Sequence, residues 1–214
     1  MVNARRNGAL ACVKVGHLSE KRDTLMLQLK SSRLTLVPMT HDDFELFVRD
    51  ILTDPKVVEY YHSYRELFDL QQIRVRAEKD FWRHFEISRK KCGCEIWSIF
   101  TGLVPEDKAF IGWTGLVHTV LSERYGPPEL QFMLTSRVFG KGYATEAATL
   151  VIEDARQREL VREIIATVDI PNKASIRVLE KLGFERQGQI DVYGSTEMYL
   201  YRYNVQRQDP HGTP

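Results

Sequence analysis

The sequence is poor in cysteine and has no long hydrophobic run. Cys92 and Cys94 stand too close together for an ordinary disulfide, and the third cysteine, Cys12, makes the number odd. No second Cys or His pair stands at metal-ligand spacing, so we expect no metal site, and free thiols in a reducing compartment. No apolar run approaches the ~20 residues of a membrane helix, and the run at 9–13 is too short for a signal peptide. We therefore expect a cytoplasmic protein that does not enter the membrane.

An excess of either charge is also missing. The 30 Lys and Arg nearly balance the 29 Asp and Glu, and a net charge of +1 gives no reason to expect a nucleic-acid or anionic-membrane partner. The hydrophobic content of 43% and length of 214 residues are typical of one soluble domain. We expect an N-terminal extension over 1–31, partly disordered, a domain over 32–205 and a tail over 206–214.

Two common phosphate-binding motifs are absent, but a third kind of glycine turn is present. The sequence has neither the P-loop pattern nor the third glycine of the dinucleotide fingerprint. It does have Arg137-Val138-Phe139-Gly140-Lys141-Gly142-Tyr143-Ala144, which follows a β-rich segment and precedes an amphipathic pattern. A strand, turn and helix in this order leave the first N–H groups of the helix free to bind a phosphate or pyrophosphate. The alternative is a tight turn with its basic residues in solvent.

The order of the predicted elements indicates an α+β or mixed α/β sheet. The patterns predict helices over 40–51 and 69–89, the second with an apolar stripe that begins at Leu70. They also predict a strand over 109–120, a loop over 122–128, and a closing hairpin of 184–190 with 196–203.

A second stretch specifies the family. Asn172-Lys173-Ala174-Ser175, followed by Lys181-Leu182-Gly183-Phe184, stands about thirty residues after the glycine turn. Together the two stretches resemble the GCN5-related N-acetyltransferase (GNAT) superfamily, in the branch of the ribosomal-protein N-terminal acetyltransferases. The resemblance implies a central, mostly antiparallel sheet with one splayed parallel strand pair, flanked by helices. It also implies acetyl-CoA as the donor and an amine, on a peptide or a small molecule, as the acceptor.

The resemblance assigns residues to the donor. Pyrophosphate is expected at the backbone of the glycine turn and the pantetheine arm along the strand before it, with further contacts from the second stretch. The residues are Met133, Leu134, Arg137, Phe139, Gly140, Lys141, Gly142, Tyr143, Ala144, Asn172, Lys173 and Arg177. For Lys173 and Arg177, a solvated helix face is the alternative.

The resemblance also suggests catalytic groups. Glu129 occupies the acidic position that this branch often carries and is the expected base, with a solvent-facing carboxylate as the alternative. His118 could serve in its place on the substrate side. Glu146 is expected only to complement the helix dipole. The tyrosine that many members carry as the acid is replaced by Leu179, which leaves Ser175, solvent or Tyr193.

The aromatic loop before the second long helix, with Tyr61 and Tyr64, is expected to shape the acceptor pocket. Family members also form homodimers, which makes one possible here. The competing interpretation is a non-catalytic module that keeps the fold and binds CoA.

Overall fold

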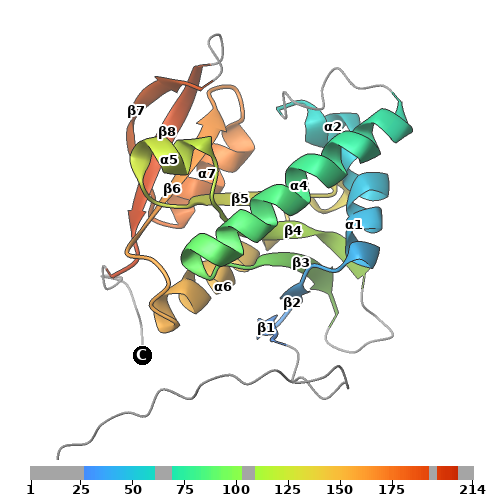
Figure 1. Cartoon of the computed structure of the whole chain (residues 1–214), viewed down its shortest axis with the longest axis horizontal. Coiled ribbons are helices and arrows are strands. Elements are labelled where there is room, and N and C mark those ends of the chain that lie inside the picture. Colours follow the sequence, from blue (N-terminus) through green and yellow to red (C-terminus); the bar gives the residue numbers. More distant parts are fainter. Residues whose placement is uncertain (1–26, 61–68, 103–108, 193–196, 207–214) are drawn as a thin grey trace, which may run out of the picture.

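The computed structural model describes residues 27–60, 69–102, 109–192 and 197–206. Within these ranges eight strands form one sheet in the order β1-β2-β3-β4-β5-β6-β8-β7 (Figure 1). Every neighbouring pair is antiparallel except β5 with β6, which is parallel. The predicted fold class is therefore confirmed. The strands are Leu29–Lys30 (β1), Leu34–Pro38 (β2), Ile96–Thr101 (β3), Ala109–Val117 (β4), Glu129–Leu134 (β5), Glu163–Asp169 (β6), Glu185–Asp191 (β7) and Glu197–Asn204 (β8).

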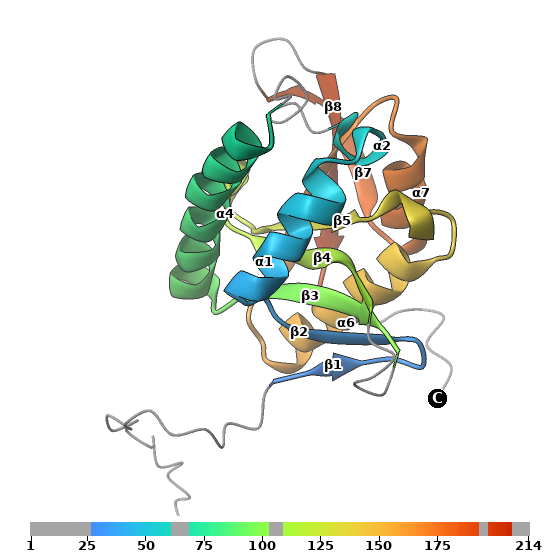
Figure 2. The same cartoon turned by 90° about the vertical axis from the view of Figure 1, so that its right-hand side faces the viewer.

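The described helices lie on both faces of the sheet (Figure 2). Helices α1 and α4 bury an aromatic-rich cluster against one face, and α6 and α7 pack a larger aliphatic cluster against the other. Helix α5 covers a small cluster of Leu121, Ile165 and Leu200. The helices are His41–Phe47 (α1), Pro55–Val58 (α2), Leu70–Cys92 (α4), Val120–Tyr125 (α5), Tyr143–Gln157 (α6) and Lys173–Lys181 (α7).

Three local predictions need correction. The strand predicted over 109–120 ends at Val117, and the segment predicted as a loop begins with helix α5. A capping box starts this helix, because the Thr119 side chain accepts from the Leu121 N–H and Ser122 Oγ accepts from the Thr119 N–H. Leu70, predicted to begin the apolar stripe of α4, is 54% exposed, because as the first residue of the helix it extends beyond the buried aromatic cluster.

Candidate functional site

The two parallel strands separate almost as soon as they meet. β5 pairs with β4 along its whole length, but its pairing with β6 is limited to Glu129 opposite Ile165. β6 continues to Asp169 in contact with β8. The edge of β5 that faces β6 is thus open at Leu134, whose backbone N–H and C=O can bind an extended, amide-bearing ligand. The backbone groups of Met133, also predicted to contact the donor, face β4 instead, because successive residues of a strand alternate between its two edges.

The open edge leads directly into the glycine turn, residues 139–142. The turn follows a short 3-10 segment, Ser136–Val138, and ends where α6 begins at Tyr143. Gly140 and Gly142 have φ values of +75° and +81°. Both are therefore in the left-handed region that favours glycine.

The start of α6 presents unpaired backbone donors. Gly142 is its N-cap and provides no side-chain cap. No hydrogen bond within the described part of the chain uses the N–H groups of residues 142–145. These donors and the positive end of the helix dipole form a site suited to an anion.

The two predicted basic residues differ in their surroundings. Lys141 is exposed on the turn. Arg137 is exposed as well, but its guanidinium donates to the Phe110 carbonyl oxygen at 2.6 Å. In this arrangement Arg137 ties the 3-10 segment to β4.

Sequence reasoning missed the residues that hold the turn from the other side. Arg33 Nε donates to Glu146 Oε2 at 2.7 Å, and its NH1 donates to the Lys141 carbonyl at 3.1 Å. Ser31 Oγ donates to Glu146 Oε1 at 2.5 Å. No local pattern marks these contacts, because Arg33 and Glu146 are 113 positions apart.

Glu146 is ionised in this setting. Partial burial alone would raise its pKa, but hydrogen bonds from Ser31 and Arg33 and the charge of Arg33 outweigh burial and lower the pKa below its ordinary value. The first turn of α6 therefore carries a full negative charge beside the free N–H groups.

Glu129 lies at the closed end of the strand divergence and is only 4% exposed. It accepts hydrogen bonds from Thr167 Oγ1 at 2.5 Å, Gln131 Nε2 at 3.0 Å and Thr119 Oγ1 at 3.1 Å. Burial raises the pKa of this carboxyl despite these donors. The alternative of a solvent-facing carboxylate is therefore wrong, because Glu129 is enclosed between β5, β6 and the start of α5.

His118 follows β4, beside the end of α4. Its backbone N–H donates to Ser88 Oγ at 2.8 Å. Burial and the nearby Lys91 lower the pKa of its imidazole. A lowered pKa leaves the ring neutral near pH 7, with one nitrogen able to accept a proton.

The second stretch forms the first turn of α7. Asn172 is the N-cap, because its Oδ1 accepts the Ser175 N–H at 3.0 Å. Lys173 is exposed and its Nζ donates back to the Ile170 carbonyl at 3.0 Å, while Arg177 is exposed on the helix surface. Leu179, where a tyrosine was expected from the resemblance, is 2% exposed and packs in the main core.

The acceptor side is described only in part. Tyr61, Tyr64 and Tyr193 lie outside the described residues. The neighbouring Tyr60 has a raised pKa, caused mainly by burial, then by Glu59, with a smaller effect from Asp169 at the end of β6. The end of α2 therefore lies near the carboxyl end of β6, across the strand divergence.

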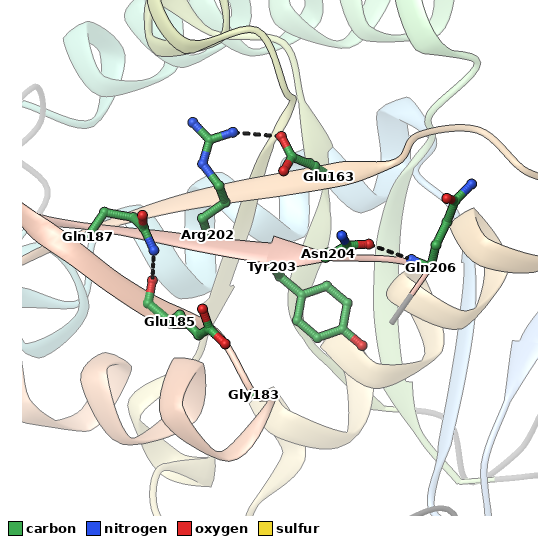
Figure 3. Close-up of a pocket in the computed structure, with 8 residues that line it drawn as sticks. All are labelled: Glu163, Gly183, Glu185, Gln187, Arg202, Tyr203, Asn204 and Gln206. Atoms are coloured by element: carbon green, nitrogen blue, oxygen red, sulfur yellow. Dashed lines mark hydrogen bonds and ion pairs between the residues drawn. The ribbon is translucent and has the colours of Figure 1, made fainter. Parts of the chain in front are cut away.

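A separate open pocket of about 450 Å³ lies where β8 extends beyond β7 (Figure 3). Polar side chains line it, among them Arg202, which pairs with Glu163 at 2.6 Å. None of the predicted site residues lines this pocket.

The described ranges contain neither a candidate metal site nor a helix suited to a membrane. No three His, Cys, Asp or Glu side chains gather there in a way that could hold a metal ion. Among the helices of the same ranges, none combines the length and apolarity required to cross a bilayer.

Comparisons with known proteins identify the family. The family model described as an acetyltransferase (GNAT) domain matches residues 33–185. The uncharacterized protein YkkB of Bacillus subtilis (strain 168) is 30% identical over 159 residues, 73% of this chain and 84% of YkkB.

Solved structures share the fold at lower identity. An acetyltransferase from Agrobacterium tumefaciens str. C58 is 23% identical with a TM-score of 0.65, over 87% of this chain and 99% of that one. RimL, a ribosomal L7/L12 alpha-N-protein acetyltransferase solved in complex with coenzyme A, is 12% identical with a TM-score of 0.65, over 83% of this chain and 98% of its own. The matched segment contains the glycine turn, the diverging strands and the capped start of α7, and the chain therefore belongs to the GNAT family of N-acetyltransferases.

Proposed function

We propose that the protein transfers an acyl group, acetyl in the simplest case, from acyl-CoA to a primary amine that attacks directly in a ternary complex. The observation that carries the proposal is the divergence of β5 from β6, which opens onto the free N–H groups at the start of α6. An open strand edge with an adjoining anion site matches a ligand with an amide-bearing arm and a pyrophosphate.

The residues present fit the donor. The N–H groups of residues 142–145 and the Lys141 ammonium would hold the pyrophosphate, and the backbone of Leu134, on the open edge of β5, would pair with the arm. Glu129 is the first of the six residues of β5, and the strand leads from it toward the glycine turn. At ~3.4 Å per residue the strand is about 20 Å long, so Glu129 and the turn lie at opposite ends of the proposed site. When bound, the donor would supply an activated thioester carbonyl near the closed end of the strand divergence.

Glu129 is the proposed base. A primary ammonium must lose a proton before its nitrogen can attack, and a base works best when its pKa lies near the working pH. Burial moves the pKa of Glu129 in that direction, while Thr119, Gln131 and Thr167 hold its oxygens in fixed positions. Glu129 then accepts the amine proton directly or through one water molecule.

Ser175 is the proposed proton donor to the leaving sulfur. Its backbone N–H is engaged by Asn172, which fixes the residue in the first turn of α7 while its hydroxyl stays available. Leu179 has no proton to give and is buried in the core.

The acceptor class is a primary amine, on a protein N-terminus or a small molecule. The name of RimL specifies a ribosomal protein N-terminus for that enzyme. We propose the same reaction class for this chain, with the acceptor to be found by screening.

The experiment that tests the proposal is thermal unfolding with and without acetyl-CoA. A ligand that binds only the native state, at ~100 times its Kd, stabilises that state by roughly 2.7 kcal/mol. We expect a clear rise in Tm, followed by amine-dependent thiol release in an acceptor screen. If neither acetyl-CoA nor a longer acyl-CoA raises the Tm at saturation, the transferase proposal fails.

A second candidate, CoA binding without catalysis, is favoured by the buried Leu179 in place of a tyrosine. It predicts the same rise in Tm with acetyl-CoA. It also predicts that CoA thiol is released from acetyl-CoA no faster with any amine than in buffer alone. The rate of thiol release should then be the same for Glu129→Gln and wild type.

A further inference from the structure

Arg33, at the start of β2, is in contact with the glycine turn and with the first turn of α6. Its guanidinium pairs with Glu146, donates to the Lys141 carbonyl and stacks over the Tyr143 ring at 4.7 Å from the centroid. The nearest atom to a Cβ built on Gly142 would be Arg33 NH2, at 3.6 Å. Arg33 thus contacts the segment proposed to bind pyrophosphate, from a strand more than a hundred positions earlier.

The contact with Lys141 sets the direction of one peptide unit. In a planar trans peptide the C=O of one residue and the N–H of the next point in opposite directions. Because Arg33 draws the Lys141 carbonyl toward β2, the Gly142 N–H points away from Arg33. That direction leaves the N–H available to a ligand.

The contact with Glu146 offsets the negative charge of this carboxylate at the start of α6. A carboxylate in the first turn of a helix is favourable to the helix dipole, but it repels an anion bound at the same end. Arg33 and Ser31 engage the two oxygens of Glu146. With Arg33 paired to it, the carboxylate supports the helix without a net negative charge at the anion site.

We propose that Arg33 is a positioning residue for the acyl-CoA donor: it orients the Lys141–Gly142 peptide and cancels the charge of Glu146. This inference rests on the proposed function, because it requires pyrophosphate at the glycine turn. Arg33 acts through the turn and Glu146.

The test is a double-mutant cycle read by the Kd of CoA in calorimetry. Arg33→Met leaves Glu146 uncompensated, and repulsion at an effective dielectric near 20 weakens CoA binding by about tenfold. Glu146→Gln alone binds CoA at least as tightly as wild type, because it leaves the Arg33 charge beside the anion site uncompensated. The double variant recovers a large part of the affinity lost in Arg33→Met because the repelling charge is gone. The KM for acyl-CoA rises in Arg33→Met while the KM for the amine stays unchanged.

The matched control is Arg156→Met. Arg156 pairs with Glu153 on the same helix, and its side chain is 48% exposed, as is that of Arg33. We expect this control to bind CoA within about twofold of wild type, since the pair lies beyond the first turn of α6. If Arg33→Met lowers the Tm too far for calorimetry, Arg33→Lys keeps the charge and is expected to fall between Arg33→Met and wild type.

Two results would overturn the inference: CoA affinity of Arg33→Met equal to that of Arg156→Met, or a double variant no tighter than Arg33→Met. Both require that wild type binds CoA. Wild type without affinity for CoA would instead overturn the proposed function, so the two failures are distinguishable.

Discussion

Among single residues, Glu129 has the most unusual environment for its type. It is a carboxylate almost without exposure, yet it has hydrogen-bond donors from three directions. Burying a carboxylate costs stability even when it is hydrogen-bonded, unless its proton stays bound. A position that carries this cost where β5 and β6 diverge is a candidate for a chemical role.

We expect Glu129→Gln to lower kcat/KM by about a hundredfold, the size of a typical general-base contribution. The slope of kcat/KM with pH should also flatten near the pKa of Glu129. Glu123→Gln, at an exposed position on α5, is the control and should match wild type. An unchanged pH profile in Glu129→Gln would rule out Glu129 as the base.

The same substitution makes a prediction about stability. The pKa of Glu129 is raised in the folded state above its ordinary value of 4.5, so between the two values the folded chain binds the proton more tightly than the unfolded chain. Wild type therefore loses stability as pH rises through that window. Denaturant unfolding from about pH 5 to about pH 8 should show the stability of Glu129→Gln rising relative to wild type. A constant difference would contradict the raised pKa.

At the scale of elements, helices α6 and α7 begin in different ways. Helix α6 starts at a left-handed glycine without a side-chain cap, which leaves its N–H groups to a ligand. Helix α7 starts at Asn172, whose side chain satisfies the Ser175 N–H. The same end of a helix is thus open to a ligand in one case and closed for stability in the other.

We expect Asn172→Ala to lower the free energy of unfolding by about 1 kcal/mol, the usual value of an N-cap. Asn172→Asp keeps an acceptor oxygen and should stay near wild type. Urea unfolding at constant pH measures both. Equal losses in the two variants would contradict the capping role and point to a contact that requires the amide nitrogen.

At the scale of the whole molecule, the sheet brings the first strands to the start of α6. β1 pairs with β2 at Leu29 and Lys30, and Ser31 follows directly in contact with α6. Part of the segment expected to be an extension, 1–31, therefore adds a strand to the sheet and a hydrogen bond to Glu146.

A comparison of two truncated chains tests this contribution. A chain of residues 27–214 keeps β1 and Ser31, whereas 32–214 loses both. We expect the shorter chain to unfold at lower temperature, since Ser31 makes several hydrogen bonds worth roughly 1 kcal/mol each, and to bind acetyl-CoA more weakly. Equal Tm values would place the start of the folded domain at residue 32.

The sequence by itself determined what depends on neighbours within a few positions. The strand, glycine turn and helix predicted around residues 137–144 are present as β5, a turn with Gly140 and Gly142 at positive φ, and α6. Such features follow from local sterics and side-chain-to-backbone hydrogen bonds, which the sequence displays directly. Helix α5 was missed although it is local, because serine stands where a capping box usually has Glu or Gln.

Only the tertiary structure decided the partners of the charged groups. From the sequence, Glu129 could be either a base or a solvent-facing carboxylate. In the structure it is enclosed and hydrogen-bonded by Thr119 and by Thr167, which is 38 positions away. The sequence pattern assigned no role to Arg33, whereas in the structure the sheet places Arg33 against Glu146. The pKa of a carboxyl depends on burial and on charges close in space, and the order of strands in a sheet, not distance along the chain, determines which groups come close.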